Sequence, residues 1–214
     1  MNELRYTLIS DGSSDQALLP ILTWLLRQQN VNCPIQPDWA DLRRLPKPAK
    51  KLVERLERAI ELYPCELLFV HRDAERIPCE ERKREILTVV ERVSKKVNIP
   101  PALCVVPVRM QEAWLLFDGI AIRKAAGNPR GRDDLRLPPL RQLEDLPNPK
   151  EILHDLIREA SGLNVHRQKK LHVNAIARRV AEFSSDFSLL RRLPAFLALE
   201  DDLGKIVQEQ RWNL

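Results

Sequence analysis

The segment that decides the fold is LRYTLISDGSSDQALLPILTWLLRQQ, residues 4–29. Its first part, Leu4–Ile9, is rich in β-forming residues and stops at a polar Ser-Asp-Gly turn, so it predicts a strand. From Asp15 onward the segment is almost entirely apolar, which indicates a helix that is buried on most sides. Pro20 either kinks this helix or marks its true start, because proline lacks an N–H and crowds the preceding turn.

Strands and helices alternate in the next hundred residues. Glu66–Val70 and Leu103–Val108 are short apolar runs, as expected of strands covered on both faces, and a short strand near Cys33–Ile35 is a further candidate. The predicted helices between and after them are Lys50–Tyr63, a helix opened by Pro78, and Met110–Phe117. The alternation predicts an α/β fold with a mostly parallel central sheet and helices on both faces. We expect Leu4–Ile9, Leu67–Val70 and Leu103–Val108 to be adjacent inner strands.

The chain changes character after residue 126. Residues 127–147 are rich in proline and arginine and indicate a linker or long surface loop. Asn148 and Pro149 then provide a helix start, and Gly162 suits the end of that helix. Two further helices are expected at Leu171–Phe183 and after Pro194. We therefore predict an α/β domain over residues 1–126 and a helical C-terminal region, residues 148–214, packed on it.

Composition favours an acidic partner and a reducing compartment. The 214 residues carry 35 Lys and Arg against 30 Asp and Glu, a net charge of +5 with a pI near 9.2, which is compatible with nucleic-acid binding. Cys33, Cys65, Cys79 and Cys104 are scattered and form no zinc or disulfide pattern. No apolar run is long enough for a membrane span or resembles a signal peptide. We expect a cytoplasmic protein without membrane contact.

Acidic residues follow the predicted strands. Asp11 and Asp15 come directly after the first strand, where a carboxylate beside a helix N-terminus can hold a cation or face a phosphate. Helix capping explains Asp15 equally well. Asp73 and Glu75 follow the strand ending at Val70 and share one face of an extended segment with His71. These two carboxylates can bind one Mg²⁺, although they could also be surface charges.

A third polar group follows the strand that ends at Val108. Arg109 and Glu112 lie there, where they could bind a phosphate and a metal respectively, or pair with each other at helical spacing. The carboxyl ends of parallel strands meet at one edge of a sheet, so the acids of all three segments should lie close together. Carboxylates that fix divalent ions are the arrangement that phosphoryl chemistry uses.

Four segments carry a resemblance to a known family: SDGSSDQALLPIL, LLFVHRDAE, VPVRMQEAWLL and FSLLRRLPAFLALEDDL. They extend over most of the chain, which resembles the small bacterial proteins of the DUF4276 family. These are related to the Toprim domains of topoisomerases, primases and overcoming-lysogenization-defect nucleases.

The resemblance implies a catalytic set of Asp11, Asp73 and Glu75. It implies that these three acids, with the accessory acids Asp15 and Glu112, are ligands of Mg²⁺ or Mn²⁺. Toprim enzymes normally have Glu where this chain has Asp11, and Asp where it has Glu75. The implied function is a magnesium-dependent nuclease or phosphodiesterase, and a role in defence against phage or mobile DNA is compatible with it. The alternative is a non-catalytic subunit that binds nucleic acid or another protein.

Basic residues in the later half are candidates for backbone contacts with weak sequence preference. The expected nucleic-acid contacts are Arg109, Arg130, Arg132, Arg178 and Arg179. The alternative is that these arginines form a solvated helical face.

Overall fold

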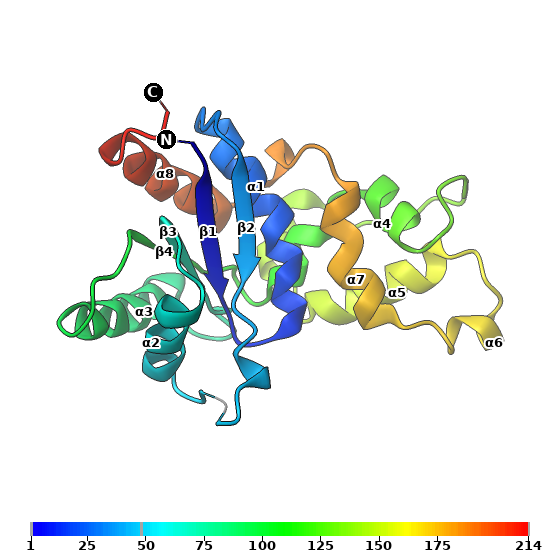
Figure 1. The fold of residues 1–214 in the computed structure, drawn as a ribbon. Helices are drawn as coiled ribbons and strands as arrows, with labels where there is room; N and C mark the ends of the chain where they lie inside the picture. Colours follow the sequence, from blue (N-terminus) through cyan, green and yellow to red (C-terminus); the bar gives the residue numbers. More distant parts are fainter. Residues whose placement is uncertain (1, 48, 214) are drawn as a thin grey trace.

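The computed structural model describes residues 2–47 and 49–213, and its centre is a four-stranded parallel sheet (Figure 1). The strands are β1 (Leu4–Ile9), β2 (Ile35–Trp39), β3 (Leu67–His71) and β4 (Ala102–Val105). They are arranged in the order β2-β1-β3-β4, and every pairing is parallel. The predicted fold class is therefore confirmed.

Two details of the strand predictions were wrong. In the described sheet β4 is an edge strand, although it is adjacent to β3 as expected. It also ends at Val105, before Pro107, which has no N–H to donate to a ladder. The strand expected near Cys33–Ile35 instead runs from Ile35 to Trp39, and its Pro37 is tolerated because β2 forms the other edge.

The two faces of the sheet are covered by different helices. On one face Leu4, Tyr6 and Leu8 pack in a large cluster that includes residues of α1 (Leu18–Gln28) and α8 (Pro194–Glu209). On the other face Ile9 packs with residues of β3, β4, α2 (Leu52–Leu62) and α3 (Cys79–Ser94). Figure 1 shows α2 and α3 on the opposite side of the sheet from α1. Helices thus bury both faces, as the uninterrupted apolar strands predicted.

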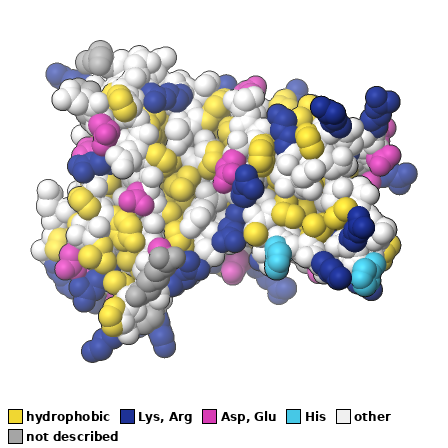
Figure 2. All heavy atoms as spheres, turned by 45° about the vertical axis from the view of Figure 1, so that its right-hand side comes forward, with side chains coloured by type: hydrophobic (Ala, Val, Ile, Leu, Met, Phe, Trp, Pro, Cys, Tyr) yellow, Lys and Arg dark blue, Asp and Glu magenta, His cyan; other side chains and the backbone are white. Residues whose placement is uncertain are grey.

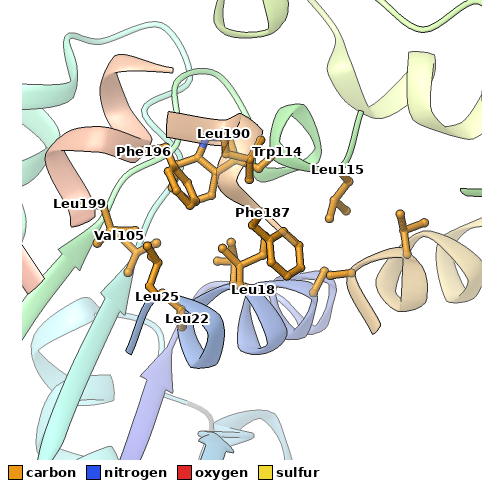
Figure 3. Close-up of a cluster of buried hydrophobic side chains, with 14 of the residues drawn as sticks. Leu18, Leu22, Leu25, Val105, Trp114, Leu115, Phe187, Leu190, Phe196 and Leu199 are labelled. Atoms are coloured by element: carbon orange, nitrogen blue, oxygen red, sulfur yellow. The ribbon is translucent and has the colours of Figure 1, made fainter. Parts of the chain in front are cut away.

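The C-terminal helices share the larger core with the sheet. Figure 3 shows Trp114, Phe187 and Phe196 gathered over Leu18 and Leu22 of α1. The rings of Trp114 and Phe196 meet edge to face with centroids 5.3 Å apart. The remaining helices are α4 (Gly119–Ala125), α5 (Pro149–Ala160), α6 (Val165–Gln168) and α7 (Val173–Arg179). Residues that precede the segment 127–147 in the sequence therefore pack in one apolar core with residues that follow it.

Short 3₁₀ helices replace several predicted loops and α-helices. Within the segment expected to be a linker, Leu140–Asp145 forms one such helix and buries Leu143 completely. The predicted helix Met110–Phe117 is a single 3₁₀ helix over Gln111–Leu115. A 3₁₀ helix over Ser13–Ala17 precedes α1, so Pro20 lies in the first turn of α1 and no kink is required. Others cover Leu42–Arg44, Val180–Phe183 and Ser188–Arg192, the second of these directly after α7.

The α5 start was predicted correctly at residue level. The Asn148 side chain accepts a hydrogen bond from the Glu151 N–H, and Pro149 occupies the first turn. Gly162, with φ of +64°, follows the helix end in the left-handed conformation that glycine adopts without strain. In the described part of the chain, no helix has the length and apolar character required to cross a membrane.

Candidate functional site: an acidic pocket at the carboxyl edge of the sheet

The parallel sheet brings the loops after β1 and β3 together, and a cavity of about 300 Å³ opens between them. We call this cavity the acidic pocket. Its lining residues are Asp11, Gly12, Ser14, Asp15, His71, Arg72, Asp73, Glu75 and Arg82. Four of the five predicted metal ligands therefore line one cavity, although up to 64 positions separate them in the sequence.

Asp15 is the most firmly held carboxylate of the acidic pocket. It is buried, and it accepts hydrogen bonds from the Gly12 N–H at 2.9 Å, the Ser14 hydroxyl at 3.0 Å and the Gln111 side-chain amide at 2.8 Å. The first bond belongs to the cap of the 3₁₀ helix before α1, in which Gly12 is the N-cap and Asp15 occupies the third helical position. The third bond holds the loop after β4 against the loop after β1.

Asp73 carries a charge that the folded protein disfavours. The pKa of this carboxyl is raised to about 6, chiefly by burial; His71 lowers the pKa, and the Glu112 and Asp15 carboxylates contribute to the increase. The Gln111 N–H donates to Asp73 Oδ1 at 2.9 Å, which fixes the orientation of the carboxyl group. A carboxylate in this environment is stabilised by any cation or proton that enters the acidic pocket.

His71 faces two of these carboxylates. Its Nδ1 lies 3.0 Å from the Val105 carbonyl oxygen, which can only accept, so Nδ1 carries a hydrogen. Its Nε2 lies 3.6 Å from Asp73 Oδ1 and 3.9 Å from Asp15 Oδ2. The imidazole and the two carboxylates therefore face one shared space, and their arrangement suits a metal cation.

Glu75 and Arg109 are joined in strained conformations at the rim of the site. Both are non-glycine residues with positive φ, +56° and +64°, and the Glu75 N–H donates to the Arg109 carbonyl at 3.1 Å. The Glu75 side chain is exposed and lies 3.9 Å from the Arg82 guanidinium. Two adjoining left-handed residues cost conformational energy, and such outliers are frequent at functional sites.

Asp11 differs from the other acids because it is already neutralised. Arg55 and Arg72 both form ion pairs with its carboxylate, the second at 3.6 Å. Its side chain is 56% exposed, so its surroundings are more solvated than those of Asp15 and Asp73. Asp11 also lines a second cavity, between the ends of β1 and β2.

Glu112 lies beside the acidic pocket and does not line it. It is buried, and burial raises its pKa, while the Lys150 ammonium lowers it. It contributes to a smaller cavity together with Lys150, His154 and Arg178. Its electrostatic effect on Asp73 nevertheless shows that the two carboxyl groups are neighbours.

Sequence reasoning missed Gln111 and left His71 outside the predicted set. Gln111 is buried and bridges the site, because its side chain binds Asp15 while its backbone N–H binds Asp73. Its Oε1 has no hydrogen-bond partner in the structure. No sequence signal indicated this role. The position of His71 on the same face as Asp73 and Glu75 could have indicated its role from the sequence. In the structure, His71 Nε2 lies within 4 Å of both Asp73 and Asp15.

The predicted basic contacts are dispersed. Arg178 borders the small cavity of Glu112, and the neighbouring Arg179 pairs with Glu182 at 3.0 Å. Arg130 and Arg132 are exposed in the segment after α4, at the right of Figure 1, and neither lines the acidic pocket. Of the predicted arginines, Arg109 lies at the rim of the site and Arg178 lies beside Glu112.

The acidic pocket offers carboxylate oxygens to a divalent cation. Within residues 2–47 and 49–213, no three His, Cys, Asp or Glu side chains converge as a ready-made metal cage. Mg²⁺ usually takes one or two carboxylates and keeps several waters. Asp15 and Asp73, both within 4 Å of His71 Nε2, offer such a pair of hard oxygen ligands. The residues present therefore fit a hydrated Mg²⁺ or Mn²⁺.

No protein-family model, no curated protein and no solved structure matches this chain. The function has therefore to be inferred from the side chains of the acidic pocket and their surroundings.

Proposed function

We propose that this chain is a Mg²⁺- or Mn²⁺-dependent nuclease or phosphodiesterase of Toprim type, with the acidic pocket as its active site. The observation that carries the proposal is the meeting of Asp11, Asp15, Asp73 and Glu75 in one cavity at the carboxyl edge of a parallel sheet. The raised pKa of Asp73 supports it, because a pocket that disfavours its own negative charge favours a cation.

Asp15 and Asp73 are the residues that would hold the cation, with Glu75 at the rim. A bound divalent ion would neutralise charge on the phosphate and make water a better nucleophile. In the hydrolysis itself, a water oxygen forms a bond to phosphorus and the bond to the leaving oxygen breaks. The products are a phosphate monoester and a hydroxyl group. One proton of the attacking water ends on the leaving oxygen, carried there through solvent.

A non-catalytic role is the second candidate, and one observation favours it. Arg55 and Arg72 occupy the carboxylate of Asp11, which is the first acid of the Toprim-type set. In this alternative the chain binds nucleic acid or another protein as a subunit of a larger system. The acids of the pocket then serve to hold the loops after β1 and β3 in place.

Cellular location and substrate are part of the same proposal. All four cysteines are free thiols, which supports a reducing compartment such as the cytoplasm. The net charge of +5 supports nucleic acid, DNA or RNA with weak sequence preference, as the partner. A role in defence against phage or mobile DNA is compatible with this chemistry.

The test is cleavage of end-labelled DNA and RNA, single- and double-stranded, at low salt with Mg²⁺, Mn²⁺ or EDTA. We expect cleavage with a divalent ion, none with EDTA, and at least a hundredfold loss in Asp73→Asn, the order of effect of removing a catalytic acid or base (about 10²–10⁴). Glu91→Gln is the matched control, because Glu91 is an exposed carboxylate of α3 paired with Lys95. Absence of cleavage on every substrate, together with no binding of either metal, would favour the non-catalytic role.

A further inference from the structure

A second cavity, of about 350 Å³, lies beside the acidic pocket between the ends of β1 and β2. We call it the basic pocket. Its lining residues are Ser10, Asp11, Trp39, Ala40, Leu42, Arg43, Ala49, Lys50 and Arg55. Asp11 lines both cavities, so the two lie on either side of this residue. Neither the sequence patterns nor the proposed hydrolysis accounts for this cavity.

The charge of the basic pocket is opposite to that of its neighbour. Three cationic side chains, Arg43, Lys50 and Arg55, line it. Arg43 is paired with Asp41, and Arg55 is paired with Asp11. Arg55 is held in place because its Nε donates to the Ala49 carbonyl at 3.1 Å and its Nη1 contacts Asp11. Among the residues that the structure describes, the Lys50 ammonium forms no ion pair. The basic pocket therefore presents positive charge that is available to an anion.

The loop between β2 and α2 adds positive charge around the basic pocket. In residues 43–47 and 49–51 of the connection between β2 and α2, the described cationic side chains are Arg43, Lys47, Lys50 and Lys51. The described part of this connection lies below the sheet in Figure 1. Figure 2 shows Lys and Arg side chains gathered at this lower end of the molecule. An anionic chain that approaches the sheet edge is thus attracted to the loop first.

The basic pocket also has a stacking surface. The indole N–H of Trp39 donates to the Ser10 hydroxyl at 2.8 Å, which fixes the ring at the wall of the cavity. The Arg43 guanidinium lies over this ring, 4.9 Å from its centroid, and its Nε is held by Asp41 at 2.8 Å. A fixed guanidinium plane on an aromatic ring is a surface on which an unpaired base can stack.

We infer that the basic pocket binds a phosphate and an adjoining unpaired base of a single-stranded nucleic acid, next to the phosphodiester in the acidic pocket. This inference rests on the proposed function and names its substrate class. A paired base is excluded from such a stack because both its faces are covered by neighbouring pairs. Cations beside an aromatic platform are the combination by which proteins hold single strands. Asp11, paired with Arg55 on one side and Arg72 on the other, separates the phosphate in the basic pocket from the phosphodiester to be cut.

The test measures binding without metal, so that it does not depend on cleavage. In EDTA, a fluorescein-labelled oligothymidylate of eight nucleotides is titrated with protein and its anisotropy is recorded. The same titration is run with an abasic oligomer of equal length, with a duplex, and with inorganic phosphate as a competitor. We expect the oligothymidylate to bind more tightly than the other three.

Variants then separate the phosphate contact from the base contact. Lys50→Gln should weaken both single-stranded oligomers and make the log–log salt slope less steep by about 0.7, the value for one phosphate on a single strand. Trp39→Leu should weaken the oligothymidylate at least about fivefold and leave the abasic oligomer unchanged, while Trp39→Phe keeps a ring and should retain binding. Lys95→Gln is the control, because Lys95 is an exposed residue at the C-terminal cap of α3.

Three results would overturn the inference: unchanged binding in Lys50→Gln, equal loss for both oligomers in Trp39→Leu, or equal affinity for the duplex. The result of this binding test can be told apart from the result of the cleavage test. If no cleavage occurs but Lys50→Gln and Trp39→Leu weaken binding as expected, hydrolysis fails and the basic pocket stands. If cleavage occurs while both variants bind like the wild type, the basic pocket fails alone.

Discussion

Replacing Asp73 with Asn removes one negative charge from the acidic pocket and keeps the shape of the side chain. The Asn oxygen can still accept the hydrogen bond that the Gln111 N–H donates to Asp73 Oδ1. The neighbouring carboxylates of Asp15 and Glu112 then face an uncharged group. The substitution therefore tests the electrostatics of the site with little change in packing.

The magnitude follows from the pKa of Asp73, which is about 6 in the folded protein against an ordinary value of 3.8. Because the pKa is raised, the folded state binds the proton more tightly than the unfolded state. This contribution to stability is present below pH 3.8 and is lost as the pH rises to about 6. At about 1.4 kcal/mol per pKa unit, the loss amounts to about 3 kcal/mol above pH 6.

The assay is urea unfolding followed by circular dichroism at pH 4.5, 6 and 7.5. In EDTA at pH 7.5, we expect Asp73→Asn to be more stable than the wild type by up to about 3 kcal/mol, and the difference to shrink toward pH 4.5. Saturating Mn²⁺ should largely abolish the difference, because a ligand at a hundred times its Kd stabilises the wild type by about 2.7 kcal/mol. Glu91→Gln should follow the wild type in every condition.

Two results would refute this reasoning. Equal stability of Asp73→Asn and wild type at pH 7.5 in EDTA would show that the carboxylate is not destabilised by its neighbours. Equal stabilisation of both proteins by Mn²⁺ would show that Asp73 does not hold the cation.

Two further predictions concern the loops and the helical end. Asp15→Ala should destabilise the metal-free protein by about 2 kcal/mol, because the Ser14 and Gln111 donors and the Gly12 N–H lose a buried acceptor; a change below about 0.5 kcal/mol in urea unfolding would contradict it. Replacing Arg178 and Arg179 by Ala should make the log–log salt dependence of duplex DNA binding less steep by about 0.9 for each arginine that contacts a phosphate, without changing Mn²⁺ affinity in calorimetry; an unchanged slope would exclude both as contacts.

Much of the fold could be predicted from the sequence alone. Leu67–Val70 is apolar throughout and Leu4–Ile9 is mostly apolar, as expected of strands that helices cover on both faces. The helix start at Asn148 follows from local capping chemistry, which operates within one turn. The meeting of acids at one sheet edge also followed, because parallel strands place their carboxyl ends together.

Only the tertiary structure determined which charged side chains lie close together, and how buried and hydrogen-bonded each carboxylate is. Arg55 lies 44 positions from Asp11, and Gln111 lies 96 positions from Asp15, yet these contacts make Asp11 an ion-paired residue and Asp15 a buried acceptor. Sequence periodicity reports the burial of a residue by its neighbours along the chain. The charge of a site depends instead on side chains brought in by distant segments, at distances of a few ångströms. The acids could therefore be listed from the sequence, whereas their separate roles and the adjoining basic pocket came from the packing of the loops.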